Sequence, residues 1–221
     1  MRTLTALHAE SWEAMSQPKA SRRPALLKDY MEASEALLQT LETVSVRLAA
    51  AVNRYDPMID QLLSIKQAAW LFRSTFGDAS LLLANGLTVG HMTPQARLNY
   101  TRFVGRHRNR LDGVEQLVTG GSVPKGLIDA LALAKTANFD PQYLALRDRI
   151  ANARVSGEKP QITASQWSPI TGGRMGSAVT VTEPALEEAK SRALALRSAA
   201  EESLIFQPSL LAALSLSPWS A

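Results

Sequence analysis

The chain has no cysteine among its 221 residues, and aromatic side chains make up only 6% of it. Without cysteine there can be no disulfide framework, no thiolate nucleophile and no zinc–thiolate centre. Strict apolar and polar alternation is almost absent, and the one alternating segment, AVTVTE at 178–183, is too short and isolated to found a sheet. Hydrophobic residues still reach 46%, which is enough for a buried core. These features predict an all-α fold.

Motifs for catalysis and for cofactor binding are also missing. The three histidines, His8, His91 and His107, have no metal-ligand spacing, and His107 is expected to be a satisfied core residue on the apolar face of its helix. Neither a nucleophile elbow (GxSxG) nor the phosphate-binding patterns GxxxxGKS/T and GxGxxG occur. The sequence therefore predicts no enzymatic activity, no metal and no cofactor.

Charge is lacking at the C-terminal end, where residues 203–221 contain no Asp, Glu, Lys or Arg. This segment is about as long as a membrane span, but serine, glutamine and proline interrupt it. We interpret it as a packed or juxtamembrane tail. At the other end, MRTLTALHAESWEAM is amphipathic and lacks the continuous apolar stretch of a signal peptide. Nothing in the chain as written is expected to export it.

Heptad repeats of apolar residues dominate the first half of the chain, between residues 24 and 54 and again between 58 and 86. Asp56 and Pro57 separate the two runs, and they suit a helix cap and a first-turn proline. We expect two long helices that form either an antiparallel pair or one rod bent at Pro57.

Further helices are expected at 3–16, 94–118, 124–137, 141–155 and 184–204, with a short one after the capping box of Thr163 and Gln166. The glycine-rich stretch 172–176 is expected to interrupt this helical pattern. The whole predicts an elongated antiparallel helical bundle that forms one domain over 1–221, with its core at 24–200. Two stacked helical modules are the alternative.

Arg73 stands in an otherwise almost chargeless helical run, close to Trp70, Phe76 and Gly77. A glycine inside a helix destabilises it by about 1 kcal/mol relative to alanine, and its missing side chain leaves a notch one turn from the arginine. A guanidinium lined by aromatic rings can receive a small anion through its planar fork of donors. Alternatively, Arg73 pairs with an acid on another helix, and Gly77 only allows close helix contact.

A second basic feature lies at 97–110, where Arg102, Arg106 and Arg110 recur every four residues among no acids. Such a stripe could contact phosphates. However, Tyr100 and Phe103 fall on the apolar side, away from any base, so nucleic-acid binding is not favoured. Instead, Arg102 or Arg106 is expected to join Arg73 around an anion, or to pair with acids across the bundle.

Two more residues are candidate ligands. Arg47 is a lone charge among small apolar residues in VSVRLAAAV, where the alternative is a solvated or salt-bridged flank position. Trp167 follows the capping box and could close a pocket at one end of the bundle, or it could be an ordinary core residue.

The layout of long helices, the segment PMIDQLLSIKQAAWLFRSTFGDAS at 57–80, the LTVGHMTP turn and the ITASQW helix start resemble the all-helical extracytoplasmic sensor domains of bacterial transmembrane receptors. The nitrate- and nitrite-sensing domains and the helical bimodular domains are the most similar types. The shared pattern is W-x-x-R-x-x-x-G at 70–77, so the resemblance nominates Arg73 with Trp70 and Gly77. The stretch 172–176 departs from the uninterrupted last helix of such domains.

The resemblance implies a periplasmic domain of an inner-membrane receptor, flanked by transmembrane helices and acting as a homodimer. Its output module would be a chemoreceptor, histidine kinase or diguanylate cyclase. Small anions or carboxylates would bind between its long helices through arginines. Two other hypotheses stay open. One is a structural or partner-binding helical bundle with no small ligand, and the other is a nucleic-acid-binding protein that uses the arginine stripe.

Overall fold

The computed structural model describes residues 2–52, 56–121 and 123–215. Seven α-helices and one short 3-10 helix form in this part of the chain, without any strand, so the predicted all-α fold with long antiparallel helices is confirmed. The chain divides into two compact units, residues 1–55 and 56–221. The single domain predicted over 1–221, and the alternative of two stacked modules, stay predictions.

The first unit is a helical hairpin made of α1 (Arg2–Met15), the 3-10 turn η1 (Lys19–Ser21) and α2 (Leu26–Val52). Arg23 fastens the hairpin, because its guanidinium pairs with Glu10 of α1 at 2.7 Å and with Asp29 of α2. Five large apolar side chains on a heptad row of α2 are at least half exposed within this unit: Leu27, Met31, Leu38, Leu41 and Leu48.

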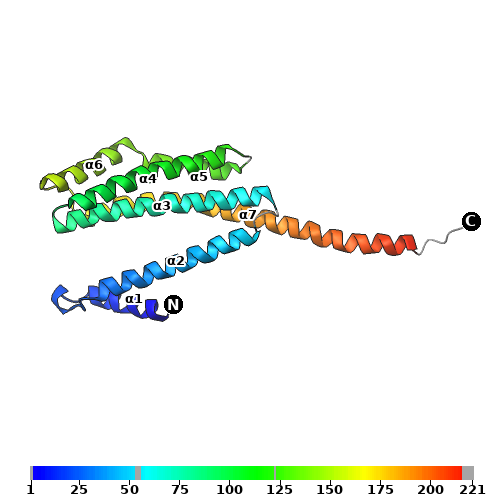
Figure 1. Cartoon of the computed structure of the whole chain (residues 1–221), viewed down its shortest axis with the longest axis horizontal. Helices are drawn as coiled ribbons and strands as arrows, with labels where there is room; N and C mark the ends of the chain where they lie inside the picture. The colour runs from blue at the N-terminus through cyan, green and yellow to red at the C-terminus, as the bar shows by residue number, and fades with distance from the viewer. Residues whose placement is uncertain (1, 53–55, 122, 216–221) are drawn as a thin grey trace, which may run out of the picture. The chain divides into compact units, whose positions relative to one another are not determined.

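The second unit contains α3 (Pro57–Val89), α4 (Pro94–Thr119), α5 (Lys125–Asn138), α6 (Pro141–Ser156) and α7 (Ala164–Ser215). Within it, α3 packs along both α4 and α7, α5 packs on α7, and α6 packs on α3 and α4 (Figure 1). Every described side chain from 190 to 204 on α7 is exposed, and Figure 1 shows this helix continuing past the other helices of its unit.

The helix starts follow the capping signals in the sequence. Asp56 accepts hydrogen bonds from two backbone N–H groups in the first turn of α3, at 2.9 and 3.1 Å, and Thr93 and Asp140 cap α4 and α6 in the same way. Thr163 and Gln166 each accept a hydrogen bond from the other's backbone N–H. The predicted caps and capping box are therefore confirmed.

Arg154 ties the end of α3 to the end of α6. Gly90 closes α3 with a left-handed φ of 94°, as a C-terminal glycine does. The guanidinium of Arg154 is buried and donates to the carbonyl oxygens of Gly90, at 2.6 Å, and of Glu158, just after α6. Since both helices point their negative ends at this place, their dipoles stabilise the cation. No ion pair among the described residues includes Arg154.

The predicted interruption at 172–176 is wrong, as is the separate last helix at 184–204, because α7 is one helix through both stretches. A Cβ added at Gly172, Gly173 or Gly176 would meet nothing within 4 Å, so these glycines lie on the open side of the helix. The opposite side buries Ala178 and Val181 in the core. Burial of that face outweighs the roughly 1 kcal/mol that each glycine costs a helix.

The core of the second unit has two clusters of buried side chains. One surrounds Leu62 and Phe72 on α3, with parts of α4, α5 and α7. The other surrounds Phe76 and Leu83, further along α3, with parts of α4, α6 and α7. The buried ring of His107 on α4 contacts Phe72 of the first cluster and Phe76 of the second, so it lies where the two clusters meet.

Candidate functional site

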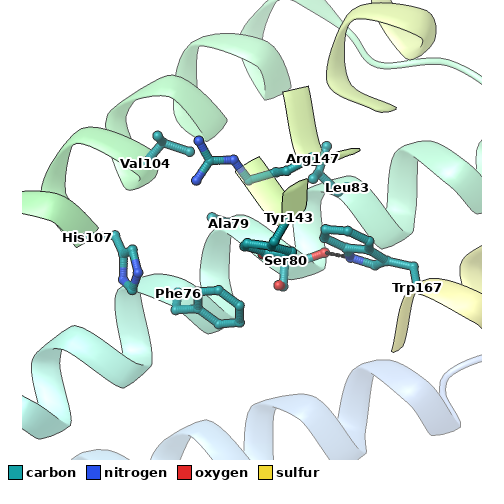
Figure 2. A pocket seen from close by; sticks show the side chains of 9 residues that line it. All are labelled: Phe76, Ala79, Ser80, Leu83, Val104, His107, Tyr143, Arg147 and Trp167. Atoms are coloured by element: carbon teal, nitrogen blue, oxygen red, sulfur yellow. Dashed lines mark hydrogen bonds between the residues drawn. The ribbon is translucent and has the colours of Figure 1, made fainter. Parts of the chain in front are cut away.

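A small cavity lies between α3, α4, α6 and α7, beside this junction. Nine side chains from the four helices line it: Phe76, Ala79, Ser80, Leu83, Val104, His107, Tyr143, Arg147 and Trp167 (Figure 2). Its volume of about 10 Å³ leaves room for about one water molecule. The lining combines aromatic rings with one guanidinium and one imidazole, and none of its described side chains is a carboxylate.

His107 is held rigidly and in one tautomer. Its ring stacks on Phe72, with centroids 4.2 Å apart, and on Phe139 at 5.3 Å. Nδ1 lies 3.2 Å from the carbonyl oxygen of Phe72, and since a carbonyl can only accept, Nδ1 must carry the proton. Nε2 then has a bare lone pair, and it is buried without a partner among the described residues. The side chain is 2% exposed.

Burial is the main reason that the pKa of His107 is lowered to about 4. The positive charge of Arg147 lowers the pKa further, whereas the hydrogen bond to Phe72 opposes the change. At neutral pH the imidazole is therefore uncharged, so the cavity holds an acceptor nitrogen that nothing in the described chain satisfies.

Arg147 supplies the positive charge of the cavity. Its side chain is only 13% exposed, and its Nε lies 3.2 Å from the carboxylate of Asp148, a solvent-exposed neighbour on the same helix. No hydrogen bond to a described residue involves its two terminal nitrogens. Figure 2 shows the guanidinium extending from α6 toward Val104 of α4. These nitrogens can bind an anion in the fork geometry that guanidinium offers.

Trp167 and Tyr143 form a fixed aromatic wall. The indole Nε1 donates to the backbone oxygen of Ser80 at 3.1 Å, and the rings of Tyr143 and Trp167 stack with centroids 5.9 Å apart. Arg174 covers Tyr143 from α7, with its guanidinium carbon 4.2 Å from the ring centroid. Burial raises the pKa of Tyr143 to about 12, an effect that the charges of Arg147 and Arg174, and then Ser80, partly offset. The phenol therefore stays neutral.

Two of the predicted ligand residues, Phe76 and Trp167, meet at this cavity, whereas Arg73, Trp70 and Gly77 do not line it. The guanidinium carbon of Arg73 lies 5.2 Å from the ring centroid of Trp70 on the same helix. No salt bridge of the described residues includes Arg73. A Cβ at Gly77 would lie 3.4 Å from Sδ of Met175 on α7, which fits the alternative of close helix contact.

The remaining predicted arginines are exposed. Arg102 and Arg106 lie on the solvent side of α4, in one stripe with Arg110, while Tyr100 of the same helix is buried as predicted. Arg47 is exposed on α2, in the first unit. None of the three lines the cavity of the second unit.

Sequence reasoning missed Arg147 and the unsatisfied nitrogen of His107. The spacing of Tyr143 and Arg147 places them one turn apart on α6, which could have indicated a shared face. However, the adjacent Asp148 and Arg149 make this stretch read as a solvated surface. The expectation that His107 is a core residue is confirmed, but only one of its two nitrogens is satisfied.

Comparisons of the chain with protein-family models, with curated proteins and with solved structures found no match. Within the described ranges, no helix has an apolar stretch long enough to cross a membrane. The same ranges contain no group of three side chains arranged to hold a metal ion.

Proposed function

We propose that this chain is the ligand-sensing domain of a bacterial signal-transduction receptor, on the periplasmic side of the inner membrane, and that it binds a small anion or carboxylate at Arg147. One observation carries the proposal. The guanidinium of Arg147 is mostly buried and pairs through Nε with the exposed carboxylate of Asp148, yet no hydrogen bond among the described residues uses its two terminal nitrogens, and none of the nine side chains that line the cavity is a carboxylate. Buried guanidinium nitrogens that lack a hydrogen-bond partner favour an anionic guest.

The size of the cavity limits the ligand and couples it to the helices. Space for about one water molecule admits only a ligand of few atoms, and even this ligand must displace side chains of the wall. Trp167 belongs to that wall and lies in the first turn of α7, the helix that runs on to Ser215. A ligand that binds a shifted arrangement of α7 more tightly would change the population of the two arrangements, which is the basis of a sensor signal.

Thermal unfolding in a panel of nitrate, nitrite, formate, acetate and small dicarboxylates tests the proposal. An anion that binds only the folded chain raises its melting temperature. We expect at least one to do so, with the effect lost in Arg147→Ala and kept in Arg149→Ala, an exposed arginine on the same helix. If Arg73→Ala abolished the response instead, the site would be the one predicted beside Trp70 and Gly77. A panel without any response would contradict a small-anion sensor.

Assembly is a second candidate function, and the exposed apolar row of α2 favours it. Five large side chains with heptad spacing suit a helix–helix interface, as in a homodimer or with a partner helix. Sedimentation of the intact chain, compared with a Leu38→Glu, Leu41→Glu double variant, tests this candidate. A dimer that the double variant abolishes would support assembly, whereas an unaltered monomer would count against it.

A further inference from the structure

We propose that an oxyanion in this cavity is held jointly by Arg147 and His107, and that its binding transfers one proton from the solvent to Nε2 of His107. This inference rests on the proposed function, since it requires an anion at Arg147. It adds a proton as a second ligand, so the domain would respond to pH and to the anion together.

The geometry leaves Nε2 as the only titrating position of the His107 ring. Nδ1–H donates to the carbonyl oxygen of Phe72 at 3.2 Å, and the ring cannot rotate freely because the rings of Phe72 and Phe139 both stack on it. Nε2 is buried and has no partner within the described part of the chain, and the side chain lines the same cavity as Arg147. A guest in this cavity would therefore lie within a lining that includes both side chains.

An oxyanion such as nitrate or formate offers only acceptor atoms. Against the neutral ring it would face the lone pair of Nε2, so two acceptors would oppose each other. Against the imidazolium it accepts a charge-assisted hydrogen bond from Nε2–H. In the uptake step a bond between Nε2 and hydrogen forms, and the corresponding O–H bond of a hydronium ion or buffer acid breaks. No electrons are exchanged.

The charges around His107 make proton and anion binding cooperative. From α6, Arg147, whose Nε pairs with the exposed Asp148, opposes protonation of the empty site, and Tyr143 stays neutral. Arg174 of α7 lies over Tyr143, and Arg108 on the helix of His107 lies over Phe139. No acidic or basic residue of α3 lines the cavity. The anion would offset the repulsion from Arg147, so the proton binds more readily once the anion is present.

Titration calorimetry with sodium nitrate and sodium formate, from about pH 5 to about pH 8 in buffers of different ionisation enthalpy, tests the inference. We expect uptake of about one proton per bound anion. While the empty site is neutral and the occupied site is protonated, the affinity should fall about tenfold for each rise of one pH unit. His107→Gln cannot take the proton, so its anion binding should be independent of pH. His91→Gln, at an exposed histidine, serves as the matched control.

The outcomes separate this inference from the proposed function. Anion binding that needs Arg147 but takes up no proton would overturn the proton linkage alone. Failure of both anions to bind the unaltered chain at any pH would overturn both proposals. The buffer comparison uses the unaltered chain, so it decides the question even if His107→Gln does not fold.

Discussion

The carboxylate of Asp56 accepts two hydrogen bonds from the guanidinium of Arg192, 136 residues further along the chain, both at 2.7 Å. The same carboxylate caps α3. The pair therefore joins the start of α3 to α7 about one turn beyond Ala189, the last buried residue among those described on α7. The hydrogen bonds from Arg192, followed by those from the backbone of α3, lower the pKa of Asp56 to about 2.

Asp56→Asn should separate the two roles of this residue. Asparagine is as good a helix cap as aspartate, but it cannot form the ion pair. We therefore expect Asp56→Asn and Arg192→Gln to lower the melting temperature by similar amounts, and the double variant to lower it little further. Arg197→Gln, which loses only an exposed pair with Glu201, is the control. A fully additive double variant would show that the two residues do not act together.

Acid should weaken the same link. The pKa of Asp56 is lower in the folded chain, about 2, than its ordinary 3.8. Its contribution to stability is thus complete above about pH 4 and is lost as the pH falls through 2. As the pH is lowered across this range, the melting temperature should fall less steeply for Asp56→Asn than for the unaltered chain. Equal pH slopes of the melting temperature in the two proteins would show that Asp56 is not the cause of the acid sensitivity.

Protonation of His107 should cause a second loss of stability, at a less acidic pH than that of Asp56. Its pKa is lowered from 6.5 to about 4, so the unfolded chain binds this proton more readily than the folded chain. Stability is full above pH 6.5 and should fall by on the order of 3 kcal/mol as the pH drops to 4. Denaturant unfolding without added anions, on the unaltered chain and His107→Gln, measures the difference. A variant with the same pH slope would refute the prediction.

Gly77→Ala tests whether the notch beside Arg73 has a role. The new methyl group would lie in ordinary contact with Met175, 3.4 Å away. Because alanine favours a helix over glycine by up to about 1 kcal/mol, we expect the variant to gain most of that amount in unfolding free energy. Gly105→Ala, where the added group meets nothing within 4 Å, is the reference. We also expect the anion response to survive, because the cavity at Arg147 is elsewhere. Loss of that response would favour the site at Arg73.

Arg154→Met should loosen the ends of α3 and α6. The change removes hydrogen bonds from a charged donor to the carbonyl oxygens of Gly90 and Glu158, so we expect a loss of about 2 kcal/mol in unfolding free energy. Arg149→Met, at an exposed position of the same helix, should change stability little. Chemical denaturation of both variants measures the difference. Equal stability of the two would show that the buried guanidinium is not needed there.

Local signals in the sequence predict most of the helix boundaries, because caps act within one turn. The pairs Asp56–Pro57, Thr93–Pro94 and Asp140–Pro141 and the box of Thr163 and Gln166 all begin helices as expected. The continuity of α7 through 172–176 could not be predicted in this way. It depends on the face that α7 buries against α3 and α5, which is a tertiary effect.

In the candidate site, too, local features can be predicted from the sequence and tertiary contacts cannot. Local spacing predicts Phe76 as a neighbour of Arg73 on one helix, and it predicts Trp167 from its place after the capping box, and both line the cavity. The meeting of His107 with Arg147 depends on how α6 lies across α3 and α4, and no spacing within either helix encodes that arrangement. The motif around Arg73 is local, and it therefore drew attention to a residue that does not line the cavity.

Binding of a small anion by Arg147 is the step on which the proposed sensor depends. Titration calorimetry of the unaltered chain and of Arg147→Gln, with the anion that most raises the melting temperature, tests it most directly. We predict one anion per chain, and an affinity weakened about thirtyfold or more in Arg147→Gln while Arg149→Gln binds normally. Equal affinity of Arg147→Gln and the unaltered chain would contradict the claim.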